Sequence, residues 1–140
     1  MPTLNRTATL NRLLQIHYRS LPMYLADARP WVAPGHEKAA EALELVVADE
    51  KRMVEKITNE LFAAQADIDL GEFPMIYTDL HDLSIDYLLK EVVESQRQDV
   101  AAIEDCVVAL RGEPLAQEAL GAAKGHLESL EEAVAETPVG

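Results

Sequence analysis

The stretch LNRLLQIHYRSLPMYLADARPW, residues 10–31, carries the helical pattern that decides the fold. Its leucines recur every three or four residues, which places them on one side of an α-helix, and His17 interrupts that apolar stripe. Pro22 lies inside the pattern, and because proline has no N–H to donate, we expect a kink or break near residues 18–21. The stretch predicts an amphipathic helix over residues 5–28 with a histidine on its apolar side.

Three further segments carry the same period, at residues 36–66, 78–110 and 114–135. Thr78 is the expected N-cap of the third segment. Gly112 and Pro114 then separate the third segment from the fourth, as glycine and proline commonly do at helix ends. No segment shows the alternation of β-branched residues that is typical of strands. The sequence predicts a single all-α domain over residues 1–140, folded as a four-helix bundle.

The composition narrows the classes of partner. The formal net charge is −13, with 12 lysine and arginine residues against 25 aspartate and glutamate residues. Affinity for nucleic acid or for an anionic membrane surface comes from clustered basic residues, so neither is an expected partner. The single cysteine, Cys106, cannot form an internal disulfide, and no apolar run is long enough for a signal peptide or a membrane span. We expect a cytoplasmic protein.

Each expected helix carries a polar residue inside its apolar stripe. Successive residues of an α-helix are about 100° apart around its axis, so the position of each residue on the helix can be calculated. Glu50 falls near the centre of the second stripe, and His126 shares a face with alanines and a leucine of the fourth. The residues found within the four stripes are His17 in the first, Glu50 in the second, Gln96 and Asp99 in the third, and His126 in the fourth.

Four of these residues lie at matching depth if the helices stack with their ends aligned. At about 1.5 Å per residue, His17 is level with Glu50, and Asp99 is level with His126. We call His17, Glu50, Asp99 and His126 the polar layer. Two imidazoles and two carboxylates in an apolar core suit Zn(II), Fe(II) or Mn(II) as metal ligands. The alternative is a metal-free cluster in which the carboxylates hold the imidazoles by charge-assisted hydrogen bonds.

Two features stay open at the level of the sequence. Asp49 competes with Glu50, and Glu91 or Gln96 with Asp99, for the position that faces the core. The connection between the second and third helices is either a crossover along the bundle or a plain up-down-up-down turn. A crossover requires its roughly 11 residues to be nearly extended, so that they reach about 36–40 Å. Both connections preserve the polar layer.

The opening stretch resembles helix A of the bacterioferritin branch of the ferritin-like superfamily. That helix carries the pattern Leu-Asn-x-Leu-Leu-x-x-Glu, a tyrosine seven residues after the glutamate, and Ala-Arg shortly after the tyrosine. His17 stands at the position of the family's metal-binding glutamate, and Tyr24 is expected near the metal. The segment KGHLESLE, residues 124–131, is similar to the Glu-Gly-His segment of helix D and places His126 on the ligand histidine of the family. The matching residues of the first pattern are Leu10, Asn11, Leu13, Leu14, Tyr24, Ala28 and Arg29.

The other ligand positions of that family differ in this chain. The Glu-x-x-His of helix D becomes Ala123-x-x-His126. The Glu-x-x-His of helix B becomes Val47-x-x-Glu50 or, without a gap, a pair that ends at Asp49. The haem-binding methionine of helix B falls where this chain has valine, so no haem is expected. The resemblance implies a ferritin-like four-helix bundle with a degenerate or remodelled di-iron site.

These observations lead to two hypotheses about function. In the first, the polar layer of a ferritin-like protein binds one Fe, Mn or Zn ion. In the second, the protein is a metal-free ferritin-like module with a structural or protein-interaction role. We expect a homodimer, and an apolar patch that includes Tyr18, Met23 and Trp31 is a candidate contact. A di-iron oxidase ranks third because too few carboxylates occupy the required positions, and whether the protein is an enzyme stays open.

Overall fold

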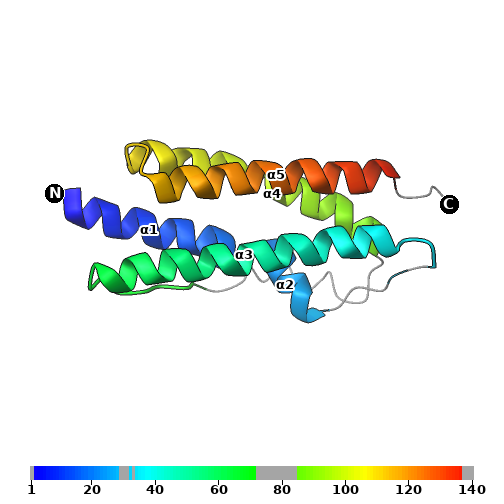
Figure 1. Cartoon of the computed structure of the whole chain (residues 1–140), viewed down its shortest axis with the longest axis horizontal. Helices are drawn as coiled ribbons and strands as arrows, with labels where there is room; N and C mark the ends of the chain where they lie inside the picture. Colours follow the sequence, from blue (N-terminus) through cyan, green and yellow to red (C-terminus); the bar gives the residue numbers. More distant parts are fainter. Residues whose placement is uncertain (1, 29–31, 33, 72–84, 137–140) are drawn as a thin grey trace.

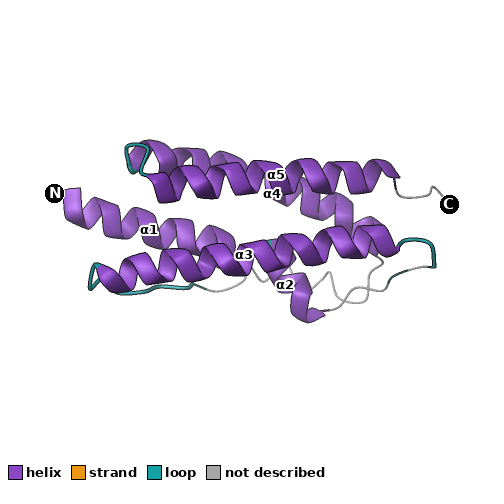
Figure 2. Cartoon of the chain, in the orientation of Figure 1, coloured by secondary structure: helices purple, strands orange, loops and turns teal. Residues whose placement is uncertain are grey.

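The computed structural model describes residues 2–136 except for 29–31, 33 and 72–84. Among these residues the only regular secondary structure is helix, and there is no strand, so the expected all-α class is confirmed (Figure 2). None of the described helices is long and apolar enough to cross a membrane. The helices are α1 (Pro2–Tyr18), α2 (Leu21–Ala28), α3 (Glu37–Ala63), α4 (Ile85–Ala109) and α5 (Pro114–Glu136).

The first expected helix is divided into α1 and α2 at the place where Pro22 predicted a break. The N–H of Ser20 donates to the carbonyl of His17 at 3.4 Å, which ends α1 in a tight turn. The Ser20 Oγ then accepts the N–H of Met23 at 3.4 Å and so caps the start of α2. Because Pro22 lies in the first turn of α2, its missing N–H removes no helical hydrogen bond.

Both α3 and α4 end in a Schellman motif. Gln65 has a left-handed φ of 56°, and the N–H of Ala66 donates to the carbonyl of Leu61. This turn ends α3 at Ala63, earlier than residue 66, where the periodicity placed its end. In the turn after α4, Arg111 and Gly112 both have positive φ, so the left-handed turn starts one residue before the expected glycine.

The four long helices α1, α3, α4 and α5 pack side by side, and α2 contacts α3 and α4 (Figure 1). Arg6, near the start of α1, pairs with Glu60 near the end of α3 and with Glu113 in the turn after α4, each at 2.7 Å. The ends of α3 and α4 therefore lie together, and the two helices run parallel. Parallel helices require the chain to return along their length, which is the crossover connection. The expected N-cap Thr78 lies outside the described residues.

The first part of the crossover is held against α1 by side-chain hydrogen bonds. The side-chain amide of Asn11 donates to the Asp67 carbonyl at 2.9 Å and accepts the N–H of Asp69 at 2.8 Å. Gln15, one turn further along α1, donates to the Asp69 carbonyl at 3.1 Å. These bonds direct the segment along α1 from the end of α3, as a crossover requires.

The core consists of two clusters of buried apolar side chains, one toward each end of the helices. Every buried residue of α3 belongs to the stripe that the periodicity predicted, including Glu50. Along the chain, the polar layer falls between members of the two clusters: His17 between Leu14 and Leu21, Glu50 between Val46 and Met53, Asp99 between Val92 and Ile103, and His126 between Ala123 and Leu130.

Candidate functional site

The members of the polar layer are buried to different degrees. His17 and Glu50 are each 4% exposed, whereas Asp99 and His126 are half-buried. Gln96, almost one turn before Asp99, is 1% exposed, so α4 contributes its amide to the core more completely than its carboxylate. Each of the four long helices therefore contributes at least one buried or half-buried polar side chain between the two apolar clusters.

The structure separates the alternatives that the sequence left open. Glu91 is exposed and does not face the core. Glu50 is the core-facing carboxylate of α3, as its position in the stripe predicted. Asp49 has 29% of its side chain exposed and reaches the seam where α3 packs against α5. Both carboxylates of α3 therefore belong to the site, Glu50 inside the layer and Asp49 at its edge.

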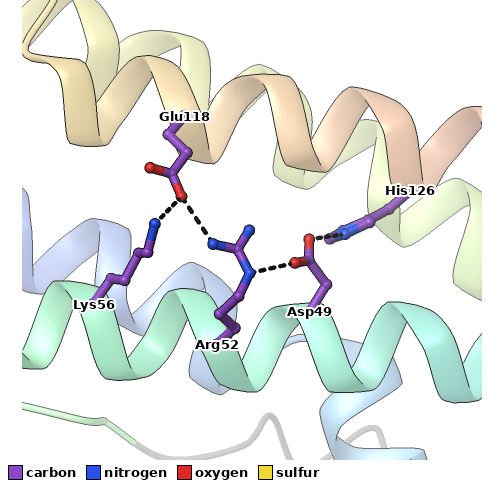
Figure 3. A network of polar contacts seen from close by, with 5 residues as sticks. All are labelled: Asp49, Arg52, Lys56, Glu118 and His126. Carbon is purple, nitrogen blue, oxygen red and sulfur yellow. Dashed lines mark hydrogen bonds and ion pairs between the residues drawn. The ribbon is translucent and has the colours of Figure 1, made fainter.

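Asp49 joins the layer to a network of charged side chains on the surface (Figure 3). Its Oδ2 lies 2.5 Å from Nε2 of His126, and its Oδ1 accepts a hydrogen bond of 2.7 Å from Nε of Arg52. Arg52 also donates to Glu118, which accepts a further bond from Lys56. Burial acts to raise the pKa of Asp49, but the hydrogen bonds from Arg52 and His126 outweigh it and hold that pKa below its usual value.

Glu50 is held by the joint between α1 and α2. The hydroxyl of Ser20 donates to Glu50 Oε2 at 3.2 Å, and the same oxygen of Ser20 caps α2. One serine therefore fixes both the direction of α2 and the position of a buried carboxyl group. The sequence analysis did not identify this role, although a serine two residues before Pro22 is a usual signal for a helix start.

Burial dominates the acid–base properties of the layer. It lowers the pKa of His17 to about 4, with a smaller effect in the same direction from His126. It raises the pKa of Glu50 well above the usual value, supported by the nearby charge of Asp99. It also raises the pKa of Asp99 to about 7. Near neutral pH His17 is therefore uncharged, and burial favours the protonated, neutral form of Glu50.

Two buried polar side-chain atoms have no hydrogen-bond partner among the described residues, Nδ1 of His126 in the layer and Oε1 of Gln96. The Gln96 amide uses its nitrogen, which donates to the carbonyl of Ala123 at 3.3 Å. Most buried polar atoms in proteins are paired, so an unpaired one indicates a missing water or ion, strain or a functional role. The imidazole nitrogen is the more informative of the two because an unprotonated ring nitrogen is a metal ligand.

The layer consists of pairs of side chains in this conformation. Within the described part of the chain, no three histidine, cysteine, aspartate or glutamate side chains are placed close enough to hold a metal ion. His126 pairs with Asp49, and Glu50 pairs with Ser20. Gathering the expected ligands around one ion therefore requires some of their side chains to change rotamer. Tyr24, which the resemblance placed near the metal, is half-buried and packs against the cluster that contains Leu21.

Two hollows lie elsewhere on the described surface. One, of about 340 Å³, lies between α4 and α5 beside Arg97 and Glu131, and the other, of about 370 Å³, lies between α3 and the start of α5 beside Lys56. Both are open and neither is lined by a residue of the polar layer. The charged side chains around them are largely paired with each other, as in the contact of Arg97 with Glu131.

Comparisons of the chain with protein-family models, with curated proteins and with solved structures found no match.

Proposed function

We propose that the protein is a ferritin-like four-helix bundle that binds one transition-metal ion, Fe(II), Mn(II) or Zn(II), in its core. The ligands in this proposal are the polar layer, His17, Glu50, Asp99 and His126. The observation that carries it is the buried Nδ1 of His126, which has no hydrogen-bond partner among the described residues. A metal ion would supply the partner that this nitrogen lacks.

The fold supports the ferritin-like part of the proposal. The second and third long helices, α3 and α4, run parallel, so the chain must cross the length of the molecule between them. Ferritin-like bundles need such a crossover at the same place in their helix order. His17 of the helix-A pattern lies near enough to His126 of α5 for His126 to lower its pKa.

The electrostatics of the layer support the choice of ligands. Burying Glu50 and Asp99 without a cation nearby disfavours their charged forms, which is why both pKa values are raised. A divalent cation supplies the compensating charge and displaces the protons. His17 is already in the neutral form that coordinates metals, because burial lowers its pKa to about 4.

The residues around the layer have separate roles in this proposal. The two apolar clusters exclude water from both ends of the site, which strengthens electrostatic interactions within it. Ser20 orients Glu50 through its hydroxyl. A bound ion would contribute positive charge and Lewis acidity.

A second candidate function is that of a metal-free structural or protein-interaction module, as a homodimer. The hydrogen bonds of His126 Nε2 to Asp49 and of Ser20 to Glu50 favour it, because both form without an ion. Of the apolar patch considered for the dimer contact, Tyr18 and Met23 are half-buried, and Trp31 lies outside the described residues.

The deciding measurement is the metal content of protein purified without a histidine tag, before and after loading with Fe(II), Mn(II) and Zn(II). We expect about one ion per chain, retained in His36→Ala and lost in His17→Ala and in His126→Ala. The control His36 lies at the start of α3, outside the layer. Bound metal should also raise the unfolding temperature, by an amount that grows with the logarithm of the ratio of free metal concentration to Kd. No metal under any loading condition would leave the metal-free module, whose dimer would be measured by sedimentation velocity.

A further inference from the structure

The edge of the polar layer contains a carboxylate that is not among the proposed ligands. Asp49 uses both of its oxygens, Oδ1 for Arg52 and Oδ2 for His126. A carboxylate that already accepts a hydrogen bond from a guanidinium on one oxygen has only acceptor capacity on the other. The ring nitrogen that faces it, Nε2 of His126, is therefore the one that carries the proton.

The contact with Asp49 determines whether the second ring nitrogen of His126, Nδ1, carries a proton. When Nε2 carries the only ring proton, Nδ1 keeps a free lone pair. That nitrogen is buried and lacks a hydrogen-bond partner among the described residues. His126 thus spans the boundary of the layer, with Nε2 on the half-exposed Asp49 and Nδ1 in the interior.

We infer that Asp49 is the positioning residue of the proposed metal site, holding His126 so that Nδ1 coordinates the ion. The inference rests on the proposed function. Histidine ligands commonly donate their second ring N–H to a carboxylate, which fixes the orientation of the ring and increases its basicity as a ligand. Asp49 performs this role from outside the layer and is not itself a ligand, although it falls on a ligand position in the ungapped alignment with the family.

The surface network explains why Asp49 stays at the edge of the layer. Arg52 bridges Asp49 and Glu118, and Lys56 binds the same oxygen of Glu118 at 2.6 Å (Figure 3). This chain of ion pairs ties Asp49 Oδ1 to the outer surface of the α3–α5 seam. The carboxylate cannot turn into the core without breaking its bond to Arg52.

The test compares two variants that each remove one negative charge from α3. Asp49→Asn replaces the acceptor of His126 with a side chain that both donates and accepts, so His126 no longer has a fixed tautomer. Glu55→Gln is the matched control because Glu55 is exposed on the same helix. Subtracting its effect removes the general influence of net charge on cation binding.

The first readout is the tautomer of His126 in metal-free protein. Long-range ¹H–¹⁵N correlation spectra resolve the ring nitrogens of the 4 histidines, and the resonance missing in His126→Ala identifies His126. We expect the Nε2–H form in the wild type and in Glu55→Gln, and a mixture of tautomers in Asp49→Asn. A purely structural role for Asp49 would leave the tautomer unchanged. Finding the Nδ1–H form in the wild type overturns the inference, whether or not Asp49→Asn folds.

The second readout is Zn(II) affinity, measured by competition with a chromophoric chelator. We expect Asp49→Asn to bind about 10- to 100-fold more weakly than Glu55→Gln, and the Nδ1 resonance of the wild type to shift on Zn(II) addition. Equal affinities in the two variants, or a shift at Nε2 alone, would contradict the positioning role while leaving the metal site intact. A wild type that keeps the Nε2–H tautomer but binds none of Fe(II), Mn(II) and Zn(II) refutes the proposed function and, with it, the coordination by Nδ1.

Discussion

Single residues of the polar layer make the stability of the protein depend on pH. A carboxyl whose pKa is raised by folding binds more protons in the folded state, so its contribution to stability falls as pH rises from the unfolded pKa to the folded one. Glu50 and Asp99 act in this direction. His17, with its pKa lowered to about 4, acts in the opposite direction between about pH 4 and its unfolded value of 6.5. Above pH 6.5 the opposing contribution of His17 is complete, so the free energy of unfolding should decrease where the folded carboxyls still lose protons, as Asp99 does near pH 7.

Replacing Glu50 with glutamine tests this dependence. The amide is neutral at every pH and still offers Ser20 an acceptor, so Glu50→Gln should make the decrease in stability with rising pH shallower. We expect the variant to be more stable than the wild type at pH 8 by roughly 1–3 kcal/mol. Urea unfolding at several pH values in the presence of a chelator measures this difference in the free energy of unfolding, with Glu55→Gln as the exposed control. Parallel profiles for the wild type and Glu50→Gln would show that Glu50 does not titrate as proposed.

At the scale of elements, the joint between α1 and α2 depends on one hydroxyl. Ser20→Ala removes the N-cap of α2 and the hydrogen-bond donor of Glu50 together. Loss of the cap alone costs about 0.5–2 kcal/mol, and the buried Glu50 oxygen that loses its donor adds to this. We expect the free energy of unfolding, measured with urea at pH 6.5, to decrease by an amount at or above the upper end of that range. Ser129→Ala, an exposed serine of α5, serves as the control and should change little.

At the scale of the whole molecule, the crossover depends on the contacts of Asn11. Asn11→Ala removes both side-chain bonds to residues 67 and 69, which run beside α1. Each such bond contributes about 1 kcal/mol, so the equilibrium constant for local opening of residues 66–71 should increase roughly fivefold or more. Limited proteolysis at this segment measures the change, with Asn59→Ala on the exposed face of α3 as the control. Equal cleavage rates in the two variants would mean that these bonds do not hold the crossover.

Much of the arrangement follows from the sequence because helical periodicity assigns each residue to a face. The break before Pro22 and the buried stripe of α3 with Glu50 inside it were both predictable for this reason. The metal, the ferritin-like family and the dimer stay predictions that the proposed experiments test.

The tertiary structure decided which side chains meet across helices. Periodicity tells how far a residue points toward the core, but the neighbour it contacts depends on how adjacent helices are rotated and shifted. Asp49 pairs with Arg52 on its own helix and also with His126, which is 77 residues away in the sequence. The crossover was likewise decided by contacts of Arg6 that join the ends of α3 and α4. Local sequence determined the helices and their buried faces, while the packing between helices determined the partners, because those contacts join residues far apart in the chain.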